Sequence, residues 1–259
     1  MISEKEIEEI AETLFKSEIE RKPISPLTKR YPDITIKDAY KIQSSVLKRK
    51  KNEKIVGKKI GLTSRPMQEL LGVNEPDYGY ITDKMIILEG DPVKISELIQ
   101  PKIEAEIAFV FGEELKGPGV TASEVLKKTI GVVPAIEVID SRIKDWKIKI
   151  QDTIADNASS ARVILGGKLT SIKDIDLRLV GMVLEKNGEI LSTGAGAAVL
   201  GSPAQAVAWL VNKLSEFNVG INPNEFVMSG SLVKAEDVKA GDSITATFDR
   251  LGKISTRFV

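Results

Sequence analysis

Glu104 and Glu106 lie two positions apart in a segment, residues 101–111, that has the pattern of a β-strand. Its apolar residues recur at alternate positions, and successive side chains of a strand point to opposite faces. The two carboxylates therefore share one face and repel each other unless a positive charge lies between them. A third acid, Glu137, stands inside another apolar run, residues 132–139. Three glutamates that project from β-structure could hold a hard divalent cation such as Mg²⁺ or Mn²⁺.

The composition limits the chemistry, because the 259 residues include no histidine and no cysteine. Serine–histidine triads, cysteine nucleophiles, disulfides and metal sites built from histidine or thiolate are excluded. Proton transfer must use carboxylates, lysine, tyrosine or metal-bound water, and any metal must be held by oxygen. For Glu104 and Glu106 one alternative stays open: both could lie on the solvated face of an antiparallel strand, where polar residues are common.

The charge balance indicates which partners to expect. Lys and Arg total 37, as do Asp and Glu, which gives a formal net charge of +0. This balance argues against a nucleic-acid or anionic-membrane partner that is recruited by bulk charge. No run of roughly 18 apolar residues is present, so no membrane span is expected. The acidic, amphipathic residues 1–15 lack the basic-then-apolar pattern of a signal peptide, and we expect a soluble cytoplasmic protein.

The elements that must position these acids are two N-terminal helices and a long β-rich body. A capping-box pattern begins at Ser3, and a second helix is expected to start after Thr35. The basic run of residues 48–51 is interpreted as a solvated helix end that complements the helix dipole. No linker rich in Gly, Ser or Pro follows. We therefore expect residues 1–52 to form a helical segment packed on a main body of residues 53–259.

The body reads as mostly β with a few inserted helices, without the strict alternation of a doubly wound sheet. Residues 55–62 are expected to form its first strand. Asn187-Gly188 lies between two β-like runs and predicts a hairpin, and residues 243–259 predict another. Pro203 opens a helix. The glycine cluster of residues 194–201 does not fit a dinucleotide-binding template and is interpreted as close backbone packing.

Further polar positions accompany the glutamates. Lys59 stands inside an apolar strand, where its charge is unfavourable unless it is paired, although it could also snorkel from a strand edge. Asp77 occurs in a turn-rich segment and could simply stabilise that turn. The small polar residues 155–160 would let backbone N–H groups approach an anion, but such residues also form ordinary caps and turns. Asp140 and Arg142 could form a structural ion pair.

Over nearly its whole length the chain resembles the 2-keto-4-pentenoate hydratase / 4-oxalocrotonate decarboxylase family of the fumarylacetoacetate hydrolase superfamily. Six stretches carry the resemblance, at residues 57–64, 71–79 (apart from residue 74), 102–109, 134–142 (apart from residue 138), 155–160 and 194–197. Together these stretches are far more specific than any one motif.

The resemblance implies an α+β fold, a mixed β-roll or sandwich of the fumarylacetoacetate-hydrolase C-terminal type with the N-terminal helical segment added. It also implies a divalent cation, Mg²⁺ or Mn²⁺. The family's metal ligands fall on three glutamates: Glu104, Glu106 and Glu137. Its active-site lysine falls on Lys59, with a pKa expected to be lowered by burial and the cation, and its catalytic acid falls on Asp77. Asp156 and Ser160 match polar positions that line the substrate pocket.

The implied activity belongs to aromatic meta-cleavage degradation, where members act on 2-hydroxydienoates and 2-oxo acids. We expect a hydratase that adds water to 2-hydroxypenta-2,4-dienoate and forms 4-hydroxy-2-oxopentanoate. The alternative is decarboxylation of 4-oxalocrotonate (2-oxo-hex-3-enedioate). Gln100-Pro101, residues 145–149 and residues 228–232 favour the hydratase branch, whereas Ser160-Ala161-Arg162 favours the decarboxylase.

Other interpretations rank lower. Hydrolysis of a C–C bond in an acylpyruvate generally uses a histidine–glutamate pair, and this chain has no histidine. A non-catalytic module that binds 2-oxo acids and metal would need no proton-transfer groups. The resemblance further implies a homo-oligomer, with a possible hydratase–decarboxylase complex.

Overall fold

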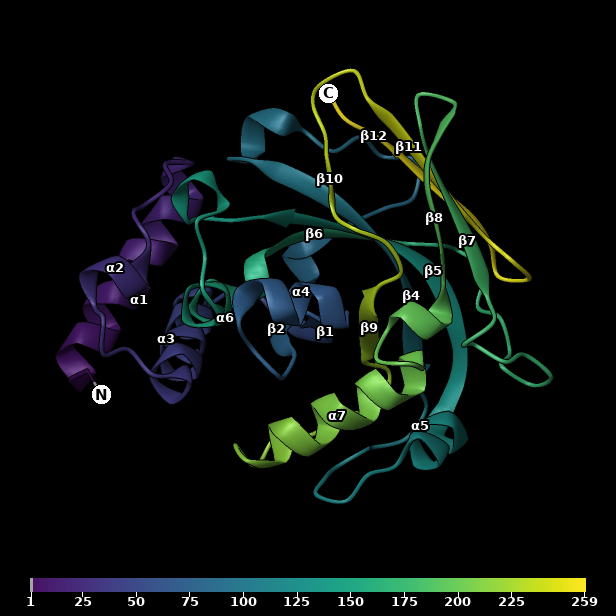
Figure 1. Ribbon diagram of the computed structural model, residues 1–259, viewed down its shortest axis with the longest axis horizontal. Helices are drawn as coiled ribbons and strands as arrows, with labels where there is room; N and C mark the ends of the chain where they lie inside the picture. The colour runs from purple at the N-terminus through teal and green to yellow at the C-terminus, as the bar shows by residue number, and fades with distance from the viewer. Residues whose placement is uncertain (1) are drawn as a thin grey trace.

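The computed structural model describes residues 2–259, apart from the side chains of residues 67, 70 and 71. Two β-sheets form the centre of the molecule, one with eight strands and one with four. The N-terminal helices lie at one end of the chain's longest dimension and the four-stranded sheet lies at the other (Figure 1). The expected mixed α+β class is confirmed, and the larger sheet is curled rather than flat.

The N-terminal segment forms α1 (Glu4–Glu20), α2 (Leu27–Arg30) and α3 (Ile36–Arg49). Capping boxes at Ser3 and Thr35 start the two long helices, as the sequence predicts, because each hydroxyl accepts an otherwise unpaired backbone N–H. The short helix α2 was not expected. Apolar residues of α1 and α3 at helical spacing are buried and join the main core.

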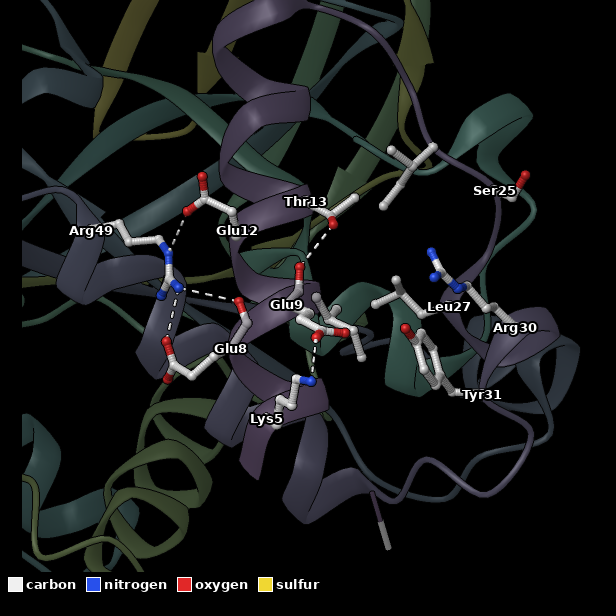
Figure 2. A pocket seen from close by; sticks show the side chains of 12 residues that line it. Lys5, Glu8, Glu9, Glu12, Thr13, Ser25, Leu27, Arg30, Tyr31 and Arg49 are labelled. Carbon is white, nitrogen blue, oxygen red and sulfur yellow. Dashed lines mark hydrogen bonds and ion pairs between the residues drawn. The ribbon is translucent and has the colours of Figure 1, made fainter. Parts of the chain in front are cut away.

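The basic end of α3 is not simply solvated, so that interpretation is wrong for two of its residues. The guanidinium of Arg49 contacts the carboxylates of Glu8 at 2.8 Å and Glu12 at 3.1 Å, both in α1. Lys50 contacts Glu18, also in α1, at 2.6 Å. Figure 2 shows Arg49 between its two acids. These ion pairs fasten α3 to α1.

The larger sheet carries the residues that the sequence singles out. Its strand order is β2 (Asp77–Thr82), β1 (Ile55–Gly61), β9 (Phe226–Ser231), β4 (Pro101–Phe111), β5 (Thr129–Asp140), β6 (Ser160–Leu165) and β3 (Ile86–Ile87), with β10 (Glu236–Asp237) also paired to β4. The strands β4 and β5 are antiparallel over almost their full length, and their register places Glu104 directly opposite Glu137.

The smaller sheet confirms both predicted hairpins. Its order is β12 (Gly252–Arg257), β11 (Ser243–Phe248), β7 (Gly181–Lys186) and β8 (Glu189–Ala195). Asn187 and Gly188 turn between β7 and β8 with positive φ, as that hairpin type requires. A Cβ on Gly196 would overlap the carbonyl of Leu177. Close backbone packing is therefore confirmed for Gly194 and Gly196, whereas Gly201 has open space at its Cβ position and a positive φ instead.

Four further helices complete the fold: α4 (Arg65–Leu71), α5 (Ala122–Lys128), α6 (Ile150–Ala155) and α7 (Pro203–Ser215). The predicted helix that begins at Pro203 is confirmed, and it packs against α5 and β9. Within residues 2–259 we find no helix with the length and apolar character that a membrane crossing requires.

The larger sheet separates two apolar clusters. Alternate residues of β4 and β5, such as Ile107 and Ile136, belong to the main core on one face. The opposite face carries a smaller cluster, which includes Ala108 and Ala135. Glu104, Glu106 and Glu137 have the parity of this second face, because side chains alternate along each strand. The glutamates therefore continue a buried apolar surface, and the alternative of an open, solvated sheet face is wrong.

The N-terminal segment contacts the body through buried polar and aromatic groups. The side-chain amide of Gln43 donates to the carbonyls of Tyr78 at 2.8 Å and Ile154 at 3.0 Å. The ring of Tyr40 stacks on that of Tyr78 with 4.5 Å between centroids. The division at residues 52 and 53 remains a prediction.

Replacing Gln43 with Leu tests how strongly this segment is joined to the body. The variant leaves two buried carbonyls without their donor, and we expect the free energy of unfolding to fall by about 1–3 kcal/mol. Urea denaturation measures the loss, with Gln205→Leu at an exposed position of α7 as the control. A single transition is expected, and two separate transitions would mean that the segment unfolds independently.

Candidate metal centre and active site

Three glutamates meet on the buried face of the larger sheet. Glu104 on β4 lies opposite Glu137 on β5, and Glu106 follows two positions along β4 on the same face. One carboxylate oxygen from each residue lies within 4.8 Å of the others. Glu106 and Glu137 are fully buried, whereas Glu104 is partly exposed, so solvent reaches the cluster from the side of Glu104.

The charges of this cluster are stabilised when the carboxylates bind protons or a cation. Burial and the neighbouring Glu137 raise the pKa of Glu104 to about 7, although Lys59 opposes the shift. Burial together with the charges of Glu137 and Glu104 raises the pKa of Glu106 well above its usual value. Crowded carboxylates resist ionisation unless positive charge is supplied. The site therefore favours either protons or a metal ion.

The hydrogen bonds of the cluster leave oxygen atoms available. One oxygen of Glu106 accepts the backbone N–H of Gly230 at 2.7 Å. Its other oxygen and one oxygen of Glu137 have no partner within residues 2–259, and the second Glu137 oxygen has only an ion pair with Lys59 at 3.3 Å. Buried polar atoms are normally satisfied, so unpartnered carboxylate oxygens that face one another fit a hard divalent cation. Among the described residues, this is the group of acids that has a metal-binding arrangement.

Lys59 lies beside the cluster on β1. Its ammonium is 3.3 Å from a carboxylate oxygen of Glu137 and donates to the carbonyl of Ala158 at 3.2 Å. Burial lowers its pKa, but the charges of Glu137 and Glu104 outweigh burial and raise that pKa above its ordinary value. The lowering expected from the sequence includes the effect of a bound cation and stays a prediction. The snorkelling alternative is wrong, because β1 lies between β2 and β9 and the side chain is buried.

Asp77 comes to the same face from β2. It is paired in register with Gly61 and is buried, so the interpretation that it only stabilises a turn is wrong. One carboxylate oxygen accepts the hydroxyl of Thr153 at 3.0 Å, and the other has no hydrogen-bond partner within residues 2–259. Burial raises its pKa, although Lys59 opposes the shift. A Cβ on Gly61 would overlap the Asp77 carboxylate and approach the Lys59 ammonium, so a glycine is needed there.

A left-handed turn supplies the carbonyl that holds Lys59. Asn157, Ala158 and Ser159 have φ angles of 55°, 49° and 56° in succession. Such angles are uncommon for residues with a Cβ, and runs of them are found where the surroundings enforce them. The Asn157 side chain accepts the Tyr80 N–H at 2.8 Å and donates to its carbonyl at 2.9 Å. Gly79 makes this approach possible, because a Cβ there would lie 2.5 Å from the Asn157 carbonyl.

Asp156 and Ser160, expected in a substrate pocket, flank this turn. The Asp156 carboxylate is buried against the guanidinium of Arg142, at 2.5 Å. The hydroxyl of Ser160 is buried without a hydrogen-bond partner within residues 2–259. Both residues line a cavity of about 20 Å³, room for roughly one water, and Glu18 and Lys50 of the N-terminal segment line it as well.

The proposed ion pair between Asp140 and Arg142 is wrong. The Asp140 carboxylate accepts the backbone N–H groups of Ile99 at 2.8 Å and Gln100 at 2.6 Å. Arg142 instead donates to the main-chain carbonyl of Asp140 and pairs with Asp156 through its side chain. The short spacing between Asp140 and Arg142 suggested that they pair. It gave no sign that Arg142 pairs with Asp156, fourteen positions further along the chain.

A much larger surface pocket, of about 880 Å³, lies between α1 and the chain around α2. Figure 2 shows that α1, Arg49 and the residues from Ser25 to Tyr31 line it. None of the site residues predicted from the sequence lines it, and its acids are engaged with Lys5 and Arg49. We therefore take the glutamate cluster, and not this surface pocket, as the candidate active site.

Comparison with known proteins agrees with this architecture. Residues 45–259 match the family model described as fumarylacetoacetate (FAA) hydrolase C-terminal. A 2-hydroxypent-2,4-dienoate hydratase from Pseudomonas putida is 50% identical over 82% of this chain and 97% of its own length. A 4-oxalocrotonate decarboxylase from Pseudomonas sp. (strain CF600) is 44% identical over 96% of both chains.

A solved structure resembles the whole molecule. The 4-oxalocrotonate decarboxylase from Pseudomonas putida G7, complexed with magnesium and adipate, superimposes with a TM-score of 0.97 at 41% identity. The match covers 100% of this chain and 99% of that chain. The resemblance inferred from sequence motifs is thus confirmed in both sequence and fold. The chain belongs to the fumarylacetoacetate hydrolase C-terminal family, among the 2-keto-4-pentenoate hydratases and 4-oxalocrotonate decarboxylases.

Proposed function

We propose that this chain is a metal-dependent hydratase that converts 2-hydroxypenta-2,4-dienoate (2-oxopent-4-enoate) into 4-hydroxy-2-oxopentanoate. The observation that carries the proposal is the buried cluster of three glutamates with Lys59 and Asp77 on the same face. The 50% identity with a 2-hydroxypent-2,4-dienoate hydratase supports this substrate. Both sequence relatives named above are lyases by their names, which supports the enzyme class.

Glu104, Glu106 and Glu137 are the residues proposed to hold Mg²⁺ or Mn²⁺. The all-oxygen donor set and the unpartnered oxygens of Glu106 and Glu137 fit such an ion, and the structural relative is complexed with magnesium. When bound, the cation supplies Lewis acidity that stabilises negative charge developing on the 2-oxo oxygen of a 2-oxo acid.

Lys59 is proposed to act as an ammonium. The surrounding carboxylates raise its pKa and so favour the ammonium form, which is suited to polarise an oxo group by donating a hydrogen bond. The Ala158 carbonyl and the Glu137 carboxylate fix the position of its Nζ atom. The same atom could also move a proton between substrate positions.

Asp77 is proposed as the acid/base or the group that positions water. The reaction moves the proton of the 2-hydroxyl to C5, and water then adds its hydroxyl to C4 while a proton joins C3. Burial raises the Asp77 pKa, which suits a carboxyl group that must both hold and release a proton. Thr153 fixes one oxygen, and the other is available to a water or substrate carbon.

Decarboxylation of 4-oxalocrotonate is the second candidate. It is supported by 44% identity with one such decarboxylase and by the TM-score of 0.97 with another. Both reactions need the same stabilisation of negative charge on the 2-oxo oxygen, so the glutamates and Lys59 serve either one. The higher identity of the hydratase relative and the local sequence features favour hydration.

The remaining expectations stay predictions. A non-catalytic module is disfavoured because binding alone would not need the buried Lys59 and Asp77 beside the glutamate cluster as proton-transfer groups. Hydrolysis of an acylpyruvate is disfavoured by the absence of histidine from the sequence. Homo-oligomerisation and a hydratase–decarboxylase complex are proposed from the family resemblance, and a cytoplasmic location stays a prediction.

A product assay separates the two leading candidates. With Mg²⁺ present, 2-hydroxypenta-2,4-dienoate should give 4-hydroxy-2-oxopentanoate, measured by loss of dienol absorbance and by NMR of the product. No carbon dioxide should be released from 2-oxo-hex-3-enedioate. Release of carbon dioxide without hydration of the dienoate would replace the hydratase assignment by the decarboxylase.

Replacing Lys59 with Met should lower kcat by about 10²–10⁴-fold, because the group that polarises the oxo oxygen is removed. Mg²⁺ affinity, measured by isothermal titration calorimetry, should be retained or increased, since one positive charge leaves the neighbourhood of Glu137. A variant with wild-type turnover would remove Lys59 from the mechanism.

Replacing Glu106 with Gln should have opposite effects on two measurements. The metal-free variant should melt at a higher temperature than the metal-free parent, because one of three crowded carboxylates is neutralised. Saturating Mg²⁺ (about 100 times its Kd) should raise the Tm of the parent by about 5–10 °C but leave the variant unchanged. Glu189→Gln, at an exposed position of β8, is the control. An equal response of both proteins to Mg²⁺ would contradict the assigned ligand set.

A further inference from the structure

We propose that Arg142 and Asp156 form a clamp that positions Lys59 through the left-handed turn of residues 157–159. In this proposal neither residue touches the substrate. The clamp holds the turn, and the carbonyl of Ala158 in the turn holds the Lys59 ammonium. The inference rests on the proposed role of Lys59 and assigns Asp156 a different task from substrate binding.

The guanidinium of Arg142 bridges both ends of the turn. It is buried, and its Nε donates to the Asp156 carboxylate at 2.5 Å. One terminal nitrogen donates to the main-chain carbonyls of Asp140 at 2.7 Å and Ser160 at 3.2 Å, and the other donates to the carbonyl of Asp156. The planar fork thus ties the residue before the turn, the residue after it, and the end of β5 to one another.

Both oxygens of the Asp156 carboxylate accept hydrogen bonds from within this clamp. One oxygen accepts the Arg142 side chain, and the other accepts the Arg142 N–H at 2.9 Å and the Ser141 hydroxyl at 3.3 Å. Burial raises the pKa of Asp156 to about 6, and the charge and hydrogen bonds of Arg142 oppose this shift. A carboxylate with these partners is committed to the fold.

The turn needs such a clamp because its backbone is unfavourable. A left-handed conformation costs roughly 1–2 kcal/mol for each residue with a Cβ, and Asn157, Ala158 and Ser159 adopt it in succession. The Asn157 side chain fastens the outer edge of the turn to Tyr80 of β2. Arg142 fastens its two ends. Without the second attachment the turn has a strong tendency to relax.

A relaxed turn would displace the partner of Lys59. The ammonium contacts the Ala158 carbonyl at 3.2 Å and the Glu137 carboxylate at 3.3 Å. If the carbonyl moves, the ammonium keeps its contact with Glu137 alone and is no longer held at the point that both groups define. A misplacement of about 1 Å at a reacting group can lower a rate by about 10²-fold without weakening binding.

The main test is Arg142→Lys. Lysine retains the charge and can pair with Asp156, but one ammonium cannot replace the fork that bridges the two ends of the turn. We expect kcat to fall by about 10- to 100-fold. KM should stay within about twofold and the Kd for Mg²⁺ should be unchanged, because Arg142 contacts neither the substrate nor the glutamates.

Arg49→Lys is the matched control. Arg49 also donates to two carboxylates and to the carbonyls of Glu8 and Ser45, but it lies between α1 and α3 (Figure 2). The same substitution there removes an equivalent fork, so kcat should not change. A comparable loss of kcat in both variants would attribute the effect to general destabilisation and overturn the proposal.

A second measurement does not depend on activity. In protein labelled with ¹⁵N-lysine, the ammonium resonance of Lys59 can be assigned by its loss in Lys59→Met. We expect this resonance to shift in Arg142→Lys and to stay in place in Arg49→Lys. The buried ammonium of Lys58, which pairs with Glu225 at 2.6 Å on the other face of β1, provides the internal reference. If Lys59→Met keeps full activity, the proposed function of Lys59 fails, yet the resonance still reports whether Arg142 positions it.

Asp156→Asn covers the case in which Arg142→Lys does not fold. Asparagine keeps the size of the side chain and leaves the carbonyl contacts of Arg142 in place, so the protein should fold while kcat falls below that of the parent and of Arg49→Lys. KM should be unchanged. A rise in KM of tenfold or more with unchanged kcat would mean that Asp156 contacts the substrate, and an unmoved Lys59 resonance in both variants would also reject the clamp.

Discussion

The buried face of the larger sheet holds more negative than positive charge, and the candidate site depends on this imbalance. Four carboxyl groups, those of Glu104, Glu106, Glu137 and Asp77, act on a single ammonium, that of Lys59. One positive charge cannot compensate four acids in a region that water barely reaches, so several of them keep their protons or a cation joins them. This constraint explains why the pKa values of Glu104, Glu106 and Asp77 are raised while that of Lys59 is also raised.

The backbone around the cluster is arranged to bring these charges together. Antiparallel register alone places Glu104 opposite Glu137, a pairing of like charges that would destabilise an ordinary sheet. Glycines supply the remaining space. Gly61 leaves room for the Asp77 carboxylate, and Gly230 offers its N–H to Glu106 where a larger residue would overlap Thr63. The apolar residues below the acids, such as Ala108 and Ala135, exclude water from one side of the site.

Periodic patterns in the sequence predicted what is local. Alternation along residues 101–111 gave the strand and the shared face of Glu104 and Glu106, capping boxes gave the helix starts, and Asn187-Gly188 gave a hairpin. The misses involve long-range partners. For Asp77, the flanking Pro and Gly left a turn-stabilising role open, yet pairing with β1 makes it a strand residue. Nothing local to Ala158 indicates a left-handed turn, which is enforced by Arg142 and by Tyr80.

The N-terminal segment contributes to the site although it carries none of the proposed catalytic groups. Gln43 donates to the carbonyls of Tyr78 and Ile154, the residues that directly follow Asp77 and Thr153. The hydroxyl of Thr153 donates a hydrogen bond to the carboxylate of Asp77 within the site. The amide of one glutamine in α3 therefore holds both backbones at the separation that this bond needs. The matched family region begins at residue 45, after Gln43, so the support for Asp77 comes from the part of the chain outside it.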